Sequence, residues 1–321
     1  MKPNLFEEEI YDHVLLVDGH NLIFRVVNAA QSELDKEKMT DPEFTFFKIY
    51  FMNALKTLIE KFNPTRVIVA IDPKNGWRKG VYKEYKAKRK AARDSSKVDF
   101  EAFFKVLDPF LEDFKKAFQN IEVLKIDEAE GDDVIAVACQ NIKSRITIVS
   151  VDEDFYQLQI FKNVSQYHPI ERVMKKSLNP MNDLQTKIIG GDENDNIPAI
   201  YPRCGPKSVE AAIKNNFIYN LHDEEYIKDE KNYAEIIKKC KIEPKQILEN
   251  YVRNTQLIDF KHITQEIVNR ILNELNNPVT KKFDGRKFMS FLVKHNLKPI
   301  LDRAQDFTNS LGRIWYQNDT I

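Results

Sequence analysis

Carboxylates recur in this chain at the points where buried strands are predicted to end. Asp18 ends an apolar run over 13–17, Asp72 ends one over 67–71, and Asp152 follows the run 146–151. In an open α/β sheet, side chains at the carboxyl ends of strands converge on one crevice. The acids that we expect there are Asp18, Asp72, Glu130, Asp132, Asp133, Asp152, Asp154, Asp192 and Asp195.

Nine carboxylates in one crevice would repel each other strongly unless cations neutralised them. Hard divalent ions such as Mg²⁺ prefer oxygen ligands, and two such ions close together are a common device for hydrolysing phosphodiesters. A single Asp more often caps a helix or starts a turn, and that alternative stays open for each member. For the set as a whole we favour metal ligation. We expect a first ion near Asp18, Asp72, Glu130, Asp132 and Asp133, and a second near Asp152, Asp154, Asp192 and Asp195.

A basic segment, residues 73–97, directly follows Asp72. It holds ten Lys or Arg residues and two acidic residues, so its net charge is +8 (ten minus two). The whole chain, in contrast, has 49 basic and 49 acidic residues and is neutral. Aromatic residues interleave with these charges, and if 81–93 is helical then Tyr82, Lys86, Arg89 and Arg93 share one face. Such a face suits phosphates and unstacked bases, whereas the alternative is a solvated charged helix. The candidate nucleic-acid contacts are Arg78, Lys79, Tyr82, Lys83, Lys90 and Arg93.

A turn around Gly205-Pro206-Lys207 precedes an apolar helical pattern. Backbone N–H groups that open a helix can bind a phosphate, aided by the helix dipole. By itself the motif is weak, because many helix–helix turns look alike. Downstream of the Asp192/Asp195 pair it becomes more specific, and Arg203, Gly205 and Lys207 are its candidate phosphate contacts.

The first two thirds of the chain alternate between strand and helix patterns, which predicts a mostly parallel central sheet with helices on both faces, an α/β fold. The length of 321 residues suggests two domains. We expect an α/β catalytic domain over 1–180 that includes the basic segment, and a helical domain over 181–321 with a DNA-binding region at about 186–216. The expected strands are 13–18, 66–72, 121–126 and 145–151, the helices 43–62, 99–118 and 132–141, and the hairpin strands 164–168 and 171–174.

Composition excludes several classes of protein. Hydrophobic residues make up 42% of the chain, as in a globular protein, and no apolar run approaches the ~20 residues that span a membrane. Residues 1–12 are acidic and lack the apolar core of a signal peptide. Cys139, Cys204 and Cys240 show no zinc-binding spacing, so we expect a protein of the reducing cytoplasm.

Together these motifs resemble the 5′-nuclease (flap endonuclease / 5′→3′ exonuclease) family, with the phage T4-type ribonuclease H branch most similar. The resemblance covers about 14–215. It rests on Leu-Val-Asp18-Gly, Ala-Ile-Asp72, Trp77-Arg78 with Tyr85-Lys86 and Arg89, Glu130-Gly-Asp132-Asp133, Val-Asp152-Glu-Asp154 and Gly-Asp192-Glu-Asn-Asp195-Asn-Ile-Pro. Two departures are Gly131, where the family commonly has Ala, and Arg203, where it usually has the first Gly of Gly-x-Gly.

The resemblance implies a 5′-nuclease core with a helical arch and a helix–hairpin–helix-type region. It implies two Mg²⁺ ions, for which Mn²⁺ substitutes, and a monovalent cation at the hairpin, although Arg203 departs from that pattern. The implied substrates are 5′ ends, flaps and RNA primers on duplex DNA during lagging-strand replication, in the host cytoplasm if the gene is a phage's. Products would carry a 5′-phosphate. Single-stranded-DNA-binding protein and a sliding clamp are implied partners of a monomer.

Three residues are expected to act on the reacting strand. Lys86 and Arg89 would neutralise charge that develops on the scissile phosphate, and Tyr85 would stack on an unpaired base. One rival is a PIN-type ribonuclease, whose domain is usually shorter and lacks the basic insertion; cutting of bare single-stranded RNA would favour it. Another is a non-catalytic DNA-binding relative, which would have lost one or more carboxylates, and none is missing here.

Overall fold

The computed structural model describes residues 13–34, 44–96, 98–221, 225, 240–278 and 281–314. The side chains of 28–34, Lys90 and Ala92 are not described. Lys97, at the end of the basic segment, and residues 1–12 therefore lie outside the described residues, as does the side chain of the candidate Lys90. No helix within the described ranges is long and apolar enough to cross a membrane.

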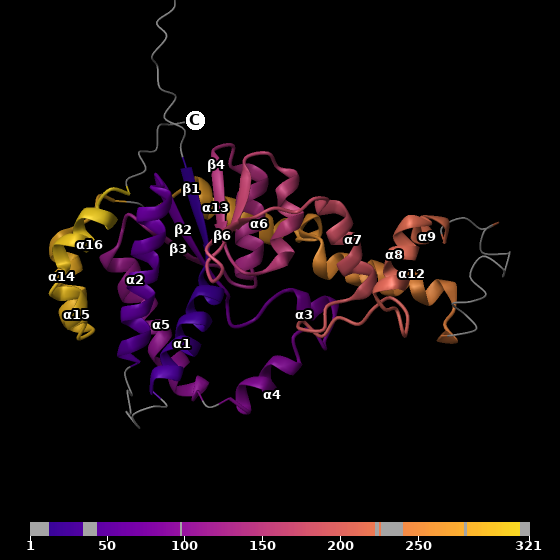
Figure 1. Ribbon diagram of the computed structural model, residues 1–321, viewed down its shortest axis with the longest axis horizontal. Coiled ribbons are helices and arrows are strands. Elements are labelled where there is room, and N and C mark those ends of the chain that lie inside the picture. The colour runs from indigo at the N-terminus through magenta and orange to yellow at the C-terminus, as the bar shows by residue number, and fades with distance from the viewer. Residues whose placement is uncertain are drawn as a thin grey trace, which may run out of the picture.

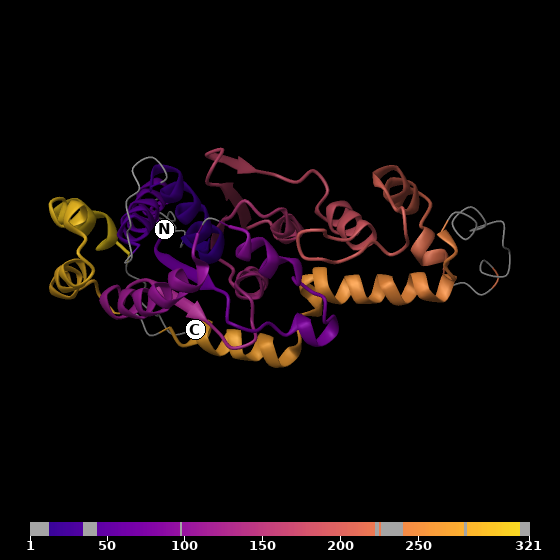
Figure 2. The ribbon, with the colours of Figure 1, turned by 90° about the horizontal axis from the view of Figure 1, so that it is seen from below.

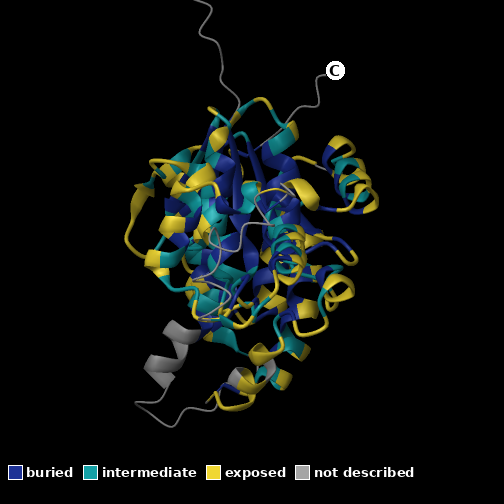
Figure 3. Cartoon of the chain, turned by 90° about the vertical axis from the view of Figure 1, so that its right-hand side faces the viewer, coloured by how far each residue is buried: buried dark blue, intermediate teal, exposed yellow. Residues whose placement is uncertain are grey.

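A six-stranded sheet forms the centre of the molecule, in the order β3-β2-β1-β4-β5-β6. The strands are β1 His13–Asp18, β2 Arg66–Ile71, β3 Glu122–Lys125, β4 Arg145–Val149, β5 Val164–His168 and β6 Val173–Lys175. All neighbouring strands are parallel except β5 and β6, which form the predicted antiparallel hairpin. Every residue of β1 and β2 is buried, and Figure 3 shows buried residues, in dark blue, in the middle of the molecule. This confirms the mostly parallel α/β sheet.

Alternating residues of the strands pack into two separate cores. Leu15 and Val17 of β1 face the core under α1 Gly19–Leu34, α2 Thr45–Phe62 and α5 Phe100–Ala117. Val14 and Leu16 face the core under α6 Gly131–Asn141 and α13 Gln265–Asn276. Because successive side chains of a strand point to opposite faces, a sheet buried on both faces needs continuous apolar runs, and these runs are what the sequence shows. The predicted helices over 43–62, 99–118 and 132–141 are present with small shifts, whereas α1 was not predicted.

The C-terminal part forms helices that extend away from the sheet and then return to it. α7 Pro180–Gly190, α8 Pro206–Lys214, α9 Phe217–Asn220 and α12 Pro244–Ile258 make the extension on the right of Figure 1, and Figure 2 shows α12 running along it. After η3 Phe260–His262, α13 packs on the sheet. Then α14 Gly285–Lys294, α15 Lys298–Leu301 and α16 Ala304–Leu311 pack on α5 and α2 through buried residues such as Phe288 and Phe307. Buried residues of α13, α14 and α16, which fall in the predicted helical domain over 181–321, therefore belong to the two cores of the sheet.

The basic segment is not one helix. It contains two short helices, α3 Arg78–Val81 and α4 Lys88–Asp94, separated by turns. Lys86, between them, has a positive φ of 56°, which no residue of a right-handed helix adopts. The condition of a continuous helix over 81–93 is therefore not met, and Tyr82, Lys86, Arg89 and Arg93 do not share one helical face. Figure 1 shows this segment crossing below the sheet as an arch between β2 and α5, and we call it the arch.

Candidate active site

Asp18 lies at the carboxyl end of β1 and is almost fully buried. Its Oδ1 accepts a hydrogen bond from the Asn21 backbone N–H at 2.9 Å, and its Oδ2 accepts one from the Ser150 hydroxyl at 2.7 Å. Burial raises the pKa of Asp18 to about 7 despite these two hydrogen bonds, and the charges of Asp72 and Asp152 raise it further. The three acids thus lie within electrostatic reach of one another at neighbouring strand ends.

The N-terminus of α6 meets the end of β2. The Gly131 N–H donates to Asp72 Oδ1 at 2.7 Å, and a Cβ on Gly131 would lie 3.1 Å from that oxygen, so the missing side chain permits the close approach. Asp132, the next residue, points into the same acidic group. Burial raises the pKa of Asp132 well above its usual range, and Asp18 is the largest of the charges that raise it further. Asp132 therefore joins the three strand-end acids.

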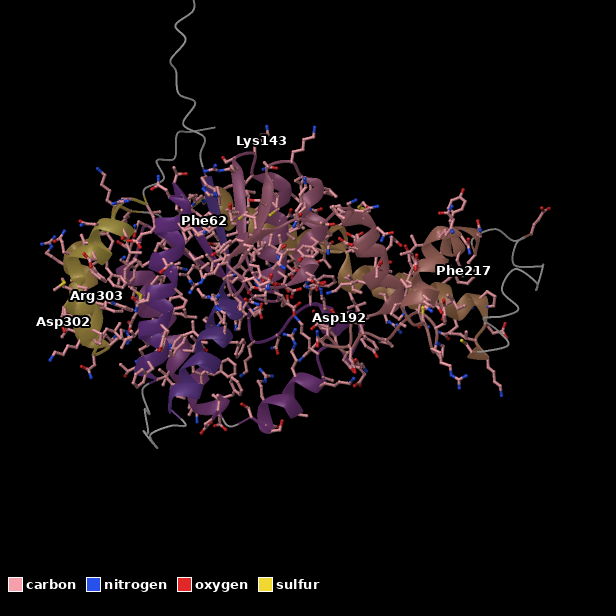
Figure 4. All side chains as sticks on the ribbon, in the orientation of Figure 1. Phe62, Lys143, Asp192, Phe217, Asp302 and Arg303 are labelled. Atoms are coloured by element: carbon pink, nitrogen blue, oxygen red, sulfur yellow. The ribbon has the colours of Figure 1, made fainter. Side chains whose placement is uncertain are left out.

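A second acidic group lies where the chain leaves β4. The Asp154 N–H donates to Asp152 Oδ1 at 2.9 Å, in the turn that begins η1 Glu153–Ile160. Burial raises the pKa of Asp154 to about 7, and the charge of Asp152 adds to this effect. Lys187 of α7 contacts Asp154 directly and lies 3.0 Å from Asp192 Oδ2. Figure 4 shows Asp192 between the body that holds the sheet and the helical extension, with Phe217 farther out.

The donor set is suited to hard cations. It contains only carboxylate oxygens, and the charges of Asp72 and Asp152 help to raise the pKa values of Asp18 and Asp132, so positive charge placed between these acids would remove an electrostatic cost. Among the described residues, no three Asp, Glu, His or Cys side chains converge closely enough to hold one ion by themselves. Carboxylate oxygens are the ligands that hard divalent cations prefer, so the residues present fit such an ion.

The middle of the arch is held by two of the predicted acids. Lys86 Nζ lies 2.9 Å from Glu130 Oε1 and 3.8 Å from Asp195 Oδ2, and Arg89 Nη2 lies 2.5 Å from Asp195 Oδ1. The Lys86 N–H also donates to the Asp195 backbone oxygen at 2.8 Å, which explains how its positive φ is maintained. Burial would raise the pKa of Glu130, but Lys86 and Arg78 outweigh it and lower this pKa to about 2. The arch cations therefore lie at the edge of the acidic crevice.

Three predicted roles need correction. Tyr85 was expected to stack on a base, but it is 3% exposed and its hydroxyl lies 2.9 Å from Glu130 Oε2 and 3.1 Å from Asp195 Oδ2. Arg78 was expected at the nucleic-acid surface, but it is 2% exposed and pairs with Glu130 and Asp133. A phosphate or a base cannot reach a buried side chain, so both residues support the arch from inside.

Asp133 was expected to bind metal, but its carboxylate is occupied by protein groups. It is fully buried, and its Oδ2 accepts hydrogen bonds from Trp77 Nε1 and from the Glu130 N–H, each at 2.9 Å. Its Oδ1 lies 2.7 Å from Arg78 Nη2. Asp133 thus fixes the start of α6 and the foot of the arch, a role that any buried acid in a capping position could take.

Several predicted nucleic-acid contacts are exposed on the arch. Lys79, Lys83 and Arg93 are exposed, so solvent and a polyanion can reach them. The ring of Tyr82 is half-buried, and the guanidinium of Arg253 lies 5.2 Å from its centre.

The hairpin turn, residues 203–207, lies on the extension, away from the sheet (Figure 1). Arg203 and Lys207 are exposed there, and Gly205 precedes α8 as its N-cap. Arg203 has a φ of 59°, the left-handed conformation that glycine adopts most easily. The backbone therefore keeps a glycine-like turn at this position, and the arginine side chain adds a charge to it.

Sequence reasoning missed two residues of the site. The ammonium group of Lys187 contacts both Asp154 and Asp192. Burial would lower the pKa of Lys187, but the charges of these two acids outweigh burial and raise it. Its position one helical turn before Gly190-Gly191 was the available signal. Ser150 was the other; its hydroxyl donates to Asp18 and accepts from the Asp152 N–H at 3.0 Å.

Comparisons with known proteins identify similar chains. The family model of the 5′-3′ exonuclease N-terminal resolvase-like domain matches residues 13–187. The chain is 27% identical to the ribonuclease H of Enterobacteria phage T4 over 94% of this chain and 98% of that protein. It is 29% identical to a 5′-3′ exonuclease of Aquifex aeolicus over 62% of this chain and 68% of the relative. Its match to DNA polymerase I of Bacillus subtilis covers only 23% of that longer protein.

Solved structures share the fold. A complex of bacteriophage T5 flap endonuclease with DNA and metal ions aligns over 83% of this chain and 99% of the other, with a TM-score of 0.60 and 18% identity. The T5 5′-exonuclease with bound zinc aligns with a TM-score of 0.59 over the same shares, also at 18% identity. Because the family model covers more than half of the sequence and the acidic crevice lies within the matched fold, the chain belongs to the 5′-3′ exonuclease family.

Proposed function

We propose that this protein is a metal-dependent 5′-nuclease. It hydrolyses phosphodiesters at 5′ ends, flaps or RNA primers on duplex DNA and leaves 5′-phosphorylated products. The observation that carries the proposal is the meeting of two opposite charge groups. Asp18, Asp72, Asp132 and Asp152 interact electrostatically, and Lys86 of the arch pairs with Glu130, two residues before Asp132. Family membership makes the activities named for the relatives the expected ones.

The acids are proposed to hold two Mg²⁺ ions, with Mn²⁺ as a substitute. Asp18, Asp72 and Asp132 would face one ion, and Asp152, Asp154 and Asp192 the other, largely through water. Bound there, the ions would activate water and neutralise charge on the phosphate oxygens. Glu130 and Asp195, both engaged by the arch, would support the crevice from its edge.

The arch and the hairpin turn are proposed to place the substrate. Lys86 and Arg89 would exchange their carboxylate partners for the scissile phosphate, where positive charge stabilises the charge that develops during hydrolysis. Lys79, Lys83, Lys90 and Arg93 would attract the backbone of the strand without reading its sequence. Arg203, Gly205 and Lys207 would grip a duplex phosphate, with a monovalent cation as a further aid.

The expected biological setting is removal of primers from the lagging strand. The naming of a relative as ribonuclease H fits cleavage of RNA primers. We expect the protein to act as a monomer in the cytoplasm, with single-stranded-DNA-binding protein and a sliding clamp as partners.

One assay tests the proposal. End-labelled flap, nicked and RNA-primed duplexes are incubated with Mg²⁺, Mn²⁺ or excess EDTA, and the products are sized on a gel. We expect short 5′-phosphorylated products with either metal and none in EDTA. Undiminished cutting in EDTA would refute metal dependence. Cutting of bare single-stranded RNA with no duplex requirement would favour the PIN-type ribonuclease, and tight binding without cutting would favour a non-catalytic relative.

A further inference from the structure

A cavity of about 590 Å³ lies beside Asp72, enclosed between the two ends of the arch. Pro73 and Lys74 line it where the arch leaves β2, and Arg93 lines it where the arch returns toward α5. Its volume is within the range of sites that bind small ligands. Of the residues that line it, only Asp72 and Arg93 have a role proposed above, and no ligand has been assigned to the space itself.

One wall of the cavity is aromatic. Phe104 of α5 lines it, with Phe24 behind at a ring-centre distance of 6.2 Å. The Arg93 guanidinium lies 5.9 Å from the centre of the Phe104 ring. His20 also lines the cavity, and its Nδ1 accepts a hydrogen bond from the Asp72 N–H at 2.9 Å, which fixes the ring. A half-buried phenylalanine beside a guanidinium is a common platform for an unpaired base.

Two cations of the lining are available to a ligand. The lining contains two lysine–carboxylate pairs, each with a separation of 2.8 Å, which are Lys105 with Glu101 and Lys125 with Asp108. Lys74 and Arg93 have no such carboxylate partner within the part of the chain that the structure describes, and both are exposed. An aromatic wall with two free cations matches the two parts of a nucleotide, its base and its phosphate.

The position of the cavity indicates which strand of a DNA substrate would reach it. The hairpin turn lies on the extension at one side of the crevice, whereas α1 and α5, which help to line the cavity, lie at the other side (Figures 1 and 2). A duplex that contacts the hairpin turn would therefore send its unpaired 5′ strand toward the cavity.

We propose that this cavity binds one nucleotide of the unpaired 5′ strand just beyond the scissile phosphate, with its base on Phe104 and its phosphate near Lys74 and Arg93. This inference rests on the proposed 5′-nuclease function and specifies where the leaving strand is held. The site recognises any base, because stacking on an aromatic ring does not depend on base identity.

Equilibrium fluorescence in EDTA tests the site without cleavage. The probe is a 5′-flap duplex with 2-aminopurine at the first unpaired nucleotide, and a second probe carries it at the fifth. We expect the wild-type protein to quench the first probe strongly and the second weakly. Phe104→Ala should remove the quenching and weaken flap binding by about fivefold to a hundredfold, the range for loss of one base stack. Binding of the same duplex without a flap should not change.

Two further variants keep the test decisive. Arg93→Gln changes an exposed side chain and should not affect folding, and it should weaken binding of the flapped duplex more than binding of the unflapped duplex. Phe46→Ala, on α2 and outside the cavity lining, is the matched control and should behave as wild type. Equal quenching of both probes, or equal losses on flapped and unflapped duplexes, would overturn the nucleotide site. Absence of cleavage in Mg²⁺ by the wild type would overturn the proposed function instead, so the two failures are distinguishable.

Discussion

Replacement of Asp18 by Asn should stabilise the metal-free protein at neutral pH. In the folded protein burial raises the pKa of Asp18 from 3.8 to about 7. A folded-state pKa above the unfolded value means that the native state binds the proton more tightly. The stabilising contribution is therefore fully present below pH 3.8 and is lost as the pH rises through about 7.

The magnitude follows from the size of this difference. Relative to a side chain that cannot ionise, this difference in pKa should lower the free energy of unfolding by about 4 kcal/mol at pH 7.5 and by about 1.5 kcal/mol at pH 5, where only the unfolded chain is ionised. An asparagine cannot ionise, and its amide oxygen can still accept the hydrogen bond from the Asn21 N–H. At about 2–4 °C per kcal/mol, Asp18→Asn should raise the melting temperature in EDTA by on the order of 10 °C at pH 7.5 and by much less at pH 5.

Thermal unfolding followed by circular dichroism, at both pH values and with EDTA or Mg²⁺, measures the effect. Mg²⁺ should raise the melting temperature of the wild type and should narrow or reverse its gap to Asp18→Asn, because the ion removes the cost of the carboxylate. Asp113→Asn is the control of opposite sign. Burial would raise the pKa of Asp113, but Lys294 and His295 outweigh it and lower this pKa, so that variant should lose stability at pH 7.5. A melting temperature of Asp18→Asn at or below wild type in EDTA at pH 7.5 would refute the reasoning.

Four further outcomes follow from the site. Asp132→Asn should abolish cleavage in Mg²⁺ while flap-duplex affinity, measured by fluorescence anisotropy, stays within about twofold, because loss of negative charge does not weaken phosphate attraction; wild-type cleavage would end its assignment as a ligand. Lys86→Ala should reduce the single-turnover rate by the equivalent of roughly 2.7–4 kcal/mol, with much less effect on affinity. Lys79→Ala should instead weaken binding modestly and reduce its salt dependence by about one counter-ion, and equal rate losses at both lysines would contradict a specific role for Lys86. Lys187→Ala should lower the melting temperature in EDTA, since Asp154 loses its partner, and Mg²⁺ should restore more stability to this variant than to wild type; an unchanged melting temperature in EDTA would show that the lysine is not a counter-ion.

Much of the fold was predictable because it depends on local patterns. The apolar runs of β1, β2 and β4 are continuous, as strands covered on both faces require, and an acid follows each run. The amphipathic pattern of α5 and the acids that begin α6 were also visible in the sequence. The helix α1 was missed although Asp18 directly precedes it and accepts a hydrogen bond from the Asn21 N–H, as an N-cap does, because Asp18 was interpreted only as a strand-end ligand.

The arch shows the limit of this approach. Its charge could be counted from the sequence, but its shape could not, because Lys86 adopts a positive φ that only its bond to the Asp195 backbone explains. Periodicity treats Tyr82 to Arg93 as one helix, since no proline or glycine interrupts it. The tertiary contact outweighs that local preference.

The sequence by itself determined which acids follow the buried strands, because hydrophobic burial sets the strands and the chain must turn at their ends. Only the tertiary structure decided which cation neutralises which acid. Tyr85 and Asp195, 110 residues apart, share a hydrogen bond, and Lys187 joins Asp154 to Asp192. Coulomb energy depends on the distance between charges and on their burial, and neither quantity can be read from positions along the chain.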